Sequence, residues 1–187
     1  MLIRKANIYD ISDIAKVHVE AWNTTYDRIM SREYLDGFTV ERRKKFWLKF
    51  INEGKSVYVV EEKSGEIVGF AVPKIARSDS NEALGEVSAM YILEKYQRQG
   101  IGKKLLITCA RLLRNVDIEK MVIWVLKDNP ACGFYKAMGG EEVDARIDRI
   151  DNKDLLKLAY KWDNLSSLIL NADKKKENKF EEFESNF

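Results

Sequence analysis

Cysteine, histidine and proline are scarce in this chain, and their scarcity excludes several kinds of protein. The 187 residues include two cysteines, two prolines and one histidine. Cys109 and Cys132 lack the spacing of metal ligands, and a single histidine leaves almost no material for a zinc site or a Ser-His-Asp triad. No signal peptide points to an oxidising compartment, so we expect free, buried thiols and no metal. His18 falls on the apolar stripe of a helix, which predicts a hydrogen-bonded core or boundary residue outside the functional site.

Long hydrophobic runs and a strong excess of charge are also missing. The longest apolar runs, residues 121–126 and 89–93, are far too short to cross a bilayer. With 45% hydrophobic and 33% charged residues and a net charge of +2, the composition indicates a soluble cytoplasmic protein without the basic excess of a nucleic-acid binder. The most highly charged helix face, within residues 41–49, is expected to be solvated surface, with polyanion binding as the alternative.

What is present is an alternation of strand and helix patterns along most of the chain. Helices are expected to begin near Asp10, at the N-cap residues Ser31 and Thr39, at Ile101, and after Asn129-Pro130. The expected strands are residues 2–5, 56–62, 67–75, 85–93, 120–126, 141–150 and 155–162. The strand, helix and strand over 85–126 imply a right-handed crossover and parallel pairing of the fourth and fifth strands. We therefore predict an α/β fold with a mixed sheet of about six to seven strands flanked by helices.

The C-terminal residues differ in composition from the rest of the chain. From Asn171 onwards the sequence is charged and lacks a sustained apolar stripe, which is typical of a frayed or disordered tail. We therefore predict one folded domain over residues 1–163 and a charged tail over residues 164–187.

The most informative stretch is the turn between the strand at 85–93 and the helix that begins at Ile101. Gly100 and Gly102 allow φ > 0 and leave the backbone amides of the turn within reach of a ligand. Because a helix begins here, its first unpaired N–H groups and the positive end of its dipole face the turn. These features predict an anion site, most naturally for phosphate. The patterns of nucleoside triphosphate loops and of the three-glycine dinucleotide fingerprint are not met.

Gln97-x-x-Gly100-x-Gly102 after an apolar strand instead resembles the acetyl-coenzyme A motif of the general-control-related N-acetyltransferase (GNAT) superfamily. A second motif of that family is matched from Asn129 to Gly139, and the order of elements agrees from residue 2 to about residue 163. The resemblance implies the GNAT fold. It also implies an N-acetyltransferase that uses acetyl-coenzyme A as co-substrate and moves the acetyl group directly to an amine.

The resemblance further implies which residues would hold the co-substrate. The turn amides would bind the pyrophosphate, and main-chain groups at the end of the preceding strand would pair with the pantetheine arm. The Ile92 amide would also stabilise the oxyanion of the reacting thioester. The cofactor-binding residues predicted in this way are Met90, Tyr91, Ile92, Gln97, Arg98, Gln99, Gly100, Ile101, Gly102, Lys103 and Asn129.

Two residues are candidates for proton transfer. An aliphatic amine has a pKa of roughly 10, so a base must act at neutral pH. Glu86 is the candidate base, directly or through water, because period-2 alternation places it on the strand face of Met90 and Ile92. The alternative interpretation of Glu86, to which we give equal weight, is a surface carboxylate paired with a basic residue. Glu82 is a weaker candidate for the base. Tyr135, in the second motif, is by resemblance the acid that protonates the departing thiolate.

The sequence leaves the acceptor open. Trp22 and Tyr26, one helical turn apart, form either core packing or the wall of an acceptor pocket, and the resemblance favours the pocket. We predict a small-molecule primary amine, such as a polyamine, an amino acid or an antibiotic. A protein N-terminus or lysine as acceptor stays open, as do a non-catalytic acyl-coenzyme A-binding module on the same fold and a homodimer.

Overall fold

A mixed seven-stranded sheet forms the centre of the computed structural model, which describes residues 1–77 and 83–184, with side chains described as far as Lys174 except that of Arg77. The strands lie in the order β1-β2-β3-β4-β5-β7-β6. Their bounds are β1 Leu2–Lys5, β2 Tyr58–Glu61, β3 Ile67–Arg77, β4 Ala83–Ile92, β5 Met121–Leu126, β6 Glu141–Ile150 and β7 Lys153–Trp162. Within this sheet β4 and β5 are parallel and the other neighbouring strands antiparallel, which confirms the predicted fold class.

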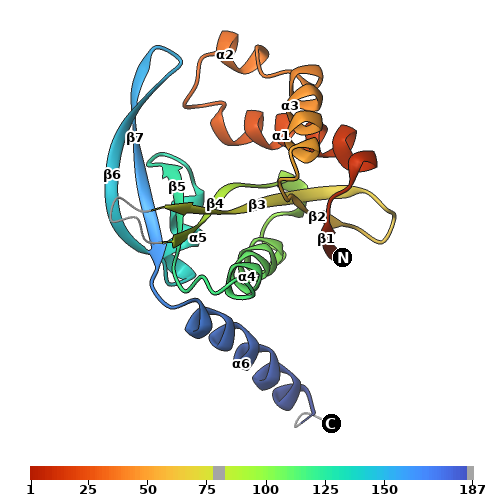
Figure 1. Cartoon of the computed structure of the whole chain (residues 1–187), viewed down its shortest axis with the longest axis vertical. Helices are drawn as coiled ribbons and strands as arrows, with labels where there is room; N and C mark the ends of the chain where they lie inside the picture. The colour runs from red at the N-terminus through yellow and green to blue at the C-terminus, as the bar shows by residue number, and fades with distance from the viewer. Residues whose placement is uncertain (78–82, 185–187) are drawn as a thin grey trace.

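Helices cover both faces of the sheet (Figure 1). On one face lie η1 Ile8–Asp10, α1 Ile11–Tyr26, α2 Arg32–Asp36 and α3 Val40–Asn52; on the other lie α4 Ile101–Arg114 and α5 Ala131–Ala137. A short 3-10 turn, η2 Glu94–Tyr96, joins β4 to the turn before α4. Ser31 and Thr39 cap α2 and α3 as predicted, each accepting a backbone N–H from three residues ahead. In the part of the chain that the structure describes, no helix is long and apolar enough to span a membrane.

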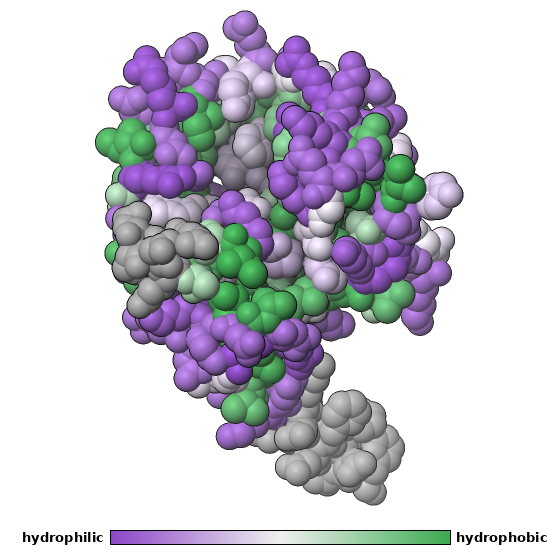
Figure 2. Space-filling model, in the orientation of Figure 1, coloured by the Kyte–Doolittle hydropathy of each residue, from purple (hydrophilic) through white to green (hydrophobic). Residues whose placement is uncertain are grey.

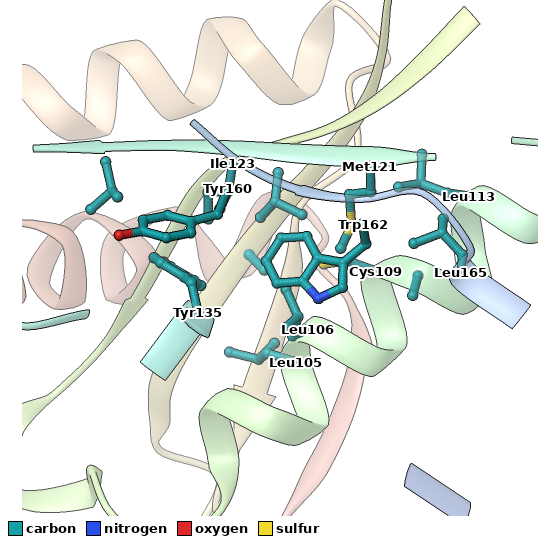
Figure 3. Packing of buried hydrophobic residues seen from close by; sticks show 14 of the residues in the cluster. Leu105, Leu106, Cys109, Leu113, Met121, Ile123, Tyr135, Tyr160, Trp162 and Leu165 are labelled. Atoms are coloured by element: carbon teal, nitrogen blue, oxygen red, sulfur yellow. The ribbon is translucent and has the colours of Figure 1, made fainter. Parts of the chain in front are cut away.

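Each face of the sheet has its own hydrophobic cluster. Leu105, Leu106 and Cys109, on one stripe of α4, are fully buried against Met121 and Trp162 of the sheet (Figure 3). The opposite cluster joins α1 and α3 to β2 and β3 through Ile14, Trp47, Val59 and Phe70. Each large side chain that is fully buried in this way contributes about 1.5–3 kcal/mol, so both helical layers are held firmly on the sheet.

A β-bulge in β4 changes which of its residues share a face. The register with β3 steps over Ser88, which has no partner residue. Val87 before the bulge and Met90 after it both pack with the α4 cluster. Glu86, next to Val87, therefore lies on the opposite face. The prediction that Glu86 shares a face with Met90 and Ile92 is wrong, because one inserted residue shifts the period-2 alternation.

The predicted hairpin of β6 and β7 turns tightly and reaches the segment between α1 and α2 (Figure 1). Asp151 and Asn152 have φ of 54° and 55°, as a two-residue type I′ turn requires. At the tip, Asp151 accepts from the Ser31 amide at 2.5 Å and from Ser31 Oγ at 2.7 Å. Lys153 Nζ donates to the Ile29 carbonyl at 3.1 Å. We call these contacts the clasp.

The C-terminal residues form a helix, α6 Leu165–Glu184, where the sequence predicted a frayed or disordered tail. Leu165 is fully buried, and its amide donates to the Glu119 carbonyl at 3.0 Å. One turn of α4 is tied to α6 by an ion pair of Arg111 with Asp173 at 2.7 Å. The prediction of disorder is therefore wrong for the first part of this segment, because contacts with α4 order it. The division of the chain at residue 163 stays a prediction.

Candidate functional site

A cavity lies where β4 and β5 separate. Their parallel register is confined to the pairs Gly85–Met121 and Glu86–Val122 at one end. Beyond it, β4 residues 87–92 and β5 residues 123–125 line a cavity of about 370 Å³, closed by the end of α1, the turn before α4 and the start of α5. Since β4 has no strand partner on that side, its backbone groups there are free to bind a ligand.

Two residues of β4 direct main-chain groups into this gap. The Leu93 amide donates to the Val68 carbonyl of β3 at 3.0 Å. In an antiparallel ladder the hydrogen-bonded positions alternate, so the main chain of Tyr91 is directed to β3 as well. Met90 and Ile92, which alternate with it, direct their N–H and C=O groups towards the gap. Met90, Tyr91 and Ile92, the three strand residues predicted to bind the cofactor, all line the cavity. Of these, Met90 and Ile92 have main-chain groups directed towards it.

The turn before α4 presents unpaired amides to the cavity. Gly100 is the N-cap of α4 with φ of 77°, and Arg98 has φ of 59°. The Lys104 amide is the first to bond within the helix, to the Gly100 carbonyl at 3.1 Å. The three amides between them therefore lack a helical acceptor, and no acidic side chain occupies the first turn. With Arg98 and Lys103 both lining the cavity, this end is suited to a phosphate group.

The two glutamines of the turn maintain its shape. Gln97 Nε2 donates to the Ile92 carbonyl, and Gln99 Nε2 donates to the Lys95 carbonyl, both at 3.0 Å. Gln97 lines the cavity and Gln99 does not. Ile101 also lies outside the cavity lining, because its side chain is buried in the core beneath the turn.

Gly102 has a different task from Gly100. A Cβ at Gly102 would stand 3.3 Å from the ring of Phe134 on α5, so the glycine allows α5 to approach α4 closely. Both Gly102 and Phe134 line the cavity, where they bring the second predicted motif against the first.

Tyr135 forms part of the cavity wall contributed by α5. Its side chain is buried, and its ring lies 5.9 Å from that of Tyr160 and 6.3 Å from that of Trp162 between centroids (Figure 3). Burial raises the pKa of the Tyr135 phenol, so the phenol is protonated at neutral pH. A protonated phenol at the wall of the cavity can donate a proton to a leaving group bound there.

Asn129 connects the start of α5 to the end of α1. Its Oδ1 accepts from the Ala131 amide at 2.8 Å, as a helix cap does, and its Nδ2 donates to Tyr26 Oη at 3.1 Å. Both side chains are buried and both residues line the cavity. Burial also raises the pKa of Tyr26. Sequence reasoning proposed both residues for the site but not the bond between them.

Trp22 does not line the cavity and instead supports a residue that does. Its ring lies 4.5 Å from that of Tyr26 and is stacked on Phe38 at 4.5 Å. Phe38 in turn lines a second hollow of about 660 Å³ between the α2–α3 region and the β6–β7 tip. Figure 2 shows the surface hollowed on this side, between the hairpin and the helices. The lining residues are Glu33, Tyr34, Gly37, Phe38, Arg42, Arg43, Asp151 and Asn152.

Glu86 is not brought to the cavity with the other predicted residues. Its carboxylate lies 3.2 Å from Lys74 Nζ on β3, and its side chain is 21% exposed. This is the arrangement that the alternative interpretation predicted, a surface carboxylate paired with a basic residue. Glu82 lies outside the residues that the structure describes. Glu94, which sequence reasoning missed, does line the cavity.

The β5 wall of the cavity, residues 123–125, was also missed. The sequence of an apolar strand that is covered on both faces does not show where its pairing with the neighbouring strand ends. His18, in contrast, is buried as predicted, with Trp47, Phe70 and Tyr91 around it at 4.9–5.4 Å between ring centroids. The predicted hydrogen bond is not found at its Nδ1, which is buried and has no partner among the described residues. Burial lowers the pKa of the imidazole to about 3.

A mixed sheet that parts between two parallel strands, beside a helix N-terminus suited to an anion, is the arrangement expected of an acyl-coenzyme A-dependent transferase. The model of the acetyltransferase (GNAT) family matches residues 18–139, and the chain belongs to this family. It is similar to the uncharacterised N-acetyltransferase YuaI of Bacillus subtilis (strain 168), with 36% identity over 166 residues, 89% of this chain and 95% of that protein.

More distant relatives differ in their acceptors. An N-alpha-acetyltransferase of Sulfurisphaera tokodaii is 27% identical, covering 75% of this chain and 80% of its own. A spermidine N(1)-acetyltransferase of Thermoplasma acidophilum is 28% identical over 71% of this chain and 81% of its own. The fold is shared with the crystal structure of PaiA N-acetyltransferase from Thermoplasma acidophilum in complex with coenzyme A, with a TM-score of 0.64, 20% identity and coverage of 87% and 100%.

The chain is therefore an N-acetyltransferase, and its co-substrate is acetyl-coenzyme A, as predicted. The residues present fit this group. The left-handed Gly100 and the unpaired amides after it suit a pyrophosphate. The main chain of Met90 and the Ile92 amide suit the amide-bearing arm, whereas the Ile92 carbonyl already accepts from Gln97.

Proposed function

We propose that this enzyme acetylates the primary amine of a small molecule, such as a polyamine, an amino acid or an antibiotic. The observation that supports this is the clasp. The hydrogen bonds of Asp151 with Ser31, and of Lys153 with Ile29, bridge the hairpin tip and the α1–α2 segment. The clasp bridges one side of the second hollow, which Asp151 lines. Such a bridge favours a small acceptor, because an extended peptide needs an open channel. A protein N-terminus or lysine is the alternative acceptor.

In the proposed mechanism the chain holds the co-substrate mostly through its backbone. The amides after Gly100 would bind the pyrophosphate, aided by the charges of Arg98 and Lys103. Met90 and Ile92 would pair with the pantetheine arm, and the Ile92 amide would stabilise the oxyanion that forms on the acetyl carbonyl. Acetyl-coenzyme A supplies the activated acyl group as a thioester.

Proton transfer completes the proposal. Tyr135 would give its phenolic proton to the departing thiolate, because it lines the cavity and is protonated at neutral pH. Glu86 would take the amine proton through water, since its carboxylate is not at the cavity itself. It shares a strand face with Ala89, which does line the cavity. If the pH–rate profile of Glu86→Gln were identical to that of the wild type, Glu86 would not be the base.

The test is thiol release from acetyl-coenzyme A across a panel of polyamines, amino acids, amino-sugar antibiotics and peptides, with mass spectrometry of the products. We expect turnover with a small amine and none with peptides. Faster turnover with a peptide would establish the alternative acceptor, and coenzyme A binding without turnover on any amine would favour a non-catalytic module.

We also assign the protein to the cytoplasm, because its two free cysteines suit a reducing compartment. Association into a homodimer stays a prediction.

A further inference from the structure

Arg43 is a partly buried cation on α3, and the residues that the structure describes provide no counterion for it. The sequence predicted solvated surface for this face of the helix, yet the guanidinium lies over the rings of Phe38 at 4.4 Å and Phe46 at 5.2 Å. Its Nε is buried without a hydrogen-bond partner. Among the residues that the structure describes, no hydrogen bond or ion pair holds Arg43. A guanidinium fork left in this way favours an external oxyanion.

The second hollow is where such an anion would bind, since Arg43 lines it. The other charged groups of the hollow are mostly committed to the protein. Asp151 uses both carboxylate oxygens on Ser31, and Arg42 Nη1 donates to the Gly37 carbonyl at 3.0 Å. Glu33, the remaining acid, is on the exposed surface of α2. Arg43 is therefore the charged group of the hollow best placed to gain from a ligand.

A row of aromatic rings lies between this hollow and the cavity, which have no lining residue in common. Phe38 lines the hollow, Trp22 stacks on Phe38, and Tyr26 lies against Trp22 and lines the cavity, with 4.5 Å between centroids at each step. A molecule that spans the row would have one end at Arg43 and the other at Tyr26. Its two ends must then be several bonds apart, as the amine and the carboxylate are in lysine or ornithine.

We propose that the acceptor is an amino acid whose carboxylate binds Arg43 in the second hollow while its distal amine enters the cavity beside Tyr26. The proposal rests on the proposed small-molecule function and narrows it. It favours diamino acids over polyamines, because polyamines have no group to pair with the guanidinium. A carboxylate in the hollow would give the Arg43 guanidinium the opposite charge that the described residues do not supply.

The test uses acceptor pairs that differ only in the carboxylate, lysine with cadaverine and ornithine with putrescine. Binding to the coenzyme A-saturated protein is measured by calorimetry, and kcat/KM by acetyl transfer. We expect the wild type to favour the carboxylate member of each pair. Arg43→Gln should lower its affinity and kcat/KM about 10–100-fold, and leave the decarboxylated member and coenzyme A binding unchanged. Arg43→Lys should recover part of the preference.

Lys45→Gln is the matched control, because it removes an exposed positive charge from the same helix outside the hollow, and it should keep the preference. Equal binding of both members of each pair to the wild type would refute the subsite, even if Arg43→Gln failed to fold. Equal weakening of both members in Arg43→Gln would refute it as well. If the protein bound the carboxylate member of each pair more tightly but acetylated neither member, the subsite would stand and the proposed function would be wrong. If it acetylated both members equally well, the proposed function would stand and the subsite would be wrong.

Discussion

At the scale of single residues, the neighbouring phenols Tyr135 and Tyr160 allow a proposed catalytic role to be tested against a packing role. Their rings are 5.9 Å apart, and of the two only Tyr135 lines the cavity. Tyr135→Phe keeps the ring and deletes the proposed proton donor, so single-turnover acetyl transfer at saturating co-substrate should fall about 10²–10⁴-fold with little change in melting temperature. Tyr160→Phe is the control and should transfer at the wild-type rate. Equal rates in the two variants would remove Tyr135 from the chemistry.

His18, the single histidine, links stability to pH. Burial lowers the pKa of its imidazole in the folded chain from the ordinary 6.5 to about 3. Between these pH values the unfolded chain binds a proton that the folded chain does not. The free energy of unfolding should therefore fall as the pH drops below 6.5, by up to about 1.4 kcal/mol per pH unit.

His18→Phe should flatten this dependence between pH 6.5 and 5, measured by urea unfolding at each pH. The buried carboxylate of Asp10, whose pKa is lowered by its hydrogen bonds with Arg4, contributes only at lower pH and does not interfere. If the variant showed the wild-type slope, some other group would titrate in this window.

The turn before α4 is the element to which we assign the pyrophosphate of the co-substrate, and its shape depends on a left-handed residue. Gly100 has φ of 77° with open space around its Cβ position, so a side chain there is opposed by the backbone conformation rather than by a clash. A non-glycine residue in this region costs about 1–2 kcal/mol, and a branched one also covers the amides. Gly100→Val should therefore weaken coenzyme A binding at least about tenfold by calorimetry.

Gly133 on α5 offers the matched substitution, because its Cβ position is also open and its φ is not positive. Gly133→Val should bind coenzyme A as the wild type does. A folded Gly100→Val protein with unchanged affinity would move the pyrophosphate away from this turn.

At the scale of the whole molecule, α6 decides where the folded unit ends. Truncation after Asp163 removes Leu165, which is fully buried, and the ion pair of Asp173 with Arg111. Loss of a buried leucine commonly costs about 2–5 kcal/mol, so the melting temperature should drop by about 5–15 °C. Leu165→Ala should act in the same direction. Leu170→Ala, at a side chain that is 58% exposed, should have little effect. An unchanged melting temperature after truncation would support the domain end at residue 163.

The sequence by itself determined the family and the elements up to β7, but not the helix α6. The spacing of Gln97, Gly100 and Gly102 predicts a helix N-terminus that binds an anion, and Ser31 and Thr39 predict two helix starts; the structure has each helix start where predicted. These features depend on residues within one turn of one another. Helix periodicity, helix capping and the need for a left-handed residue depend only on such short stretches. They can therefore be predicted from a single sequence.

Only the tertiary structure decided which residues meet at the site. The bulge at Ser88 moved Glu86 to the other face of β4, and Asn129 reaches Tyr26 across 103 positions of sequence. The hollow around Arg43 forms only once the β6–β7 tip lies beside α2 and α3. Strand register, the parting of β4 from β5 and the docking of helices arise from the packing of segments distant in sequence. No short stretch of sequence specifies them, because each depends on the shape of a partner segment elsewhere in the chain.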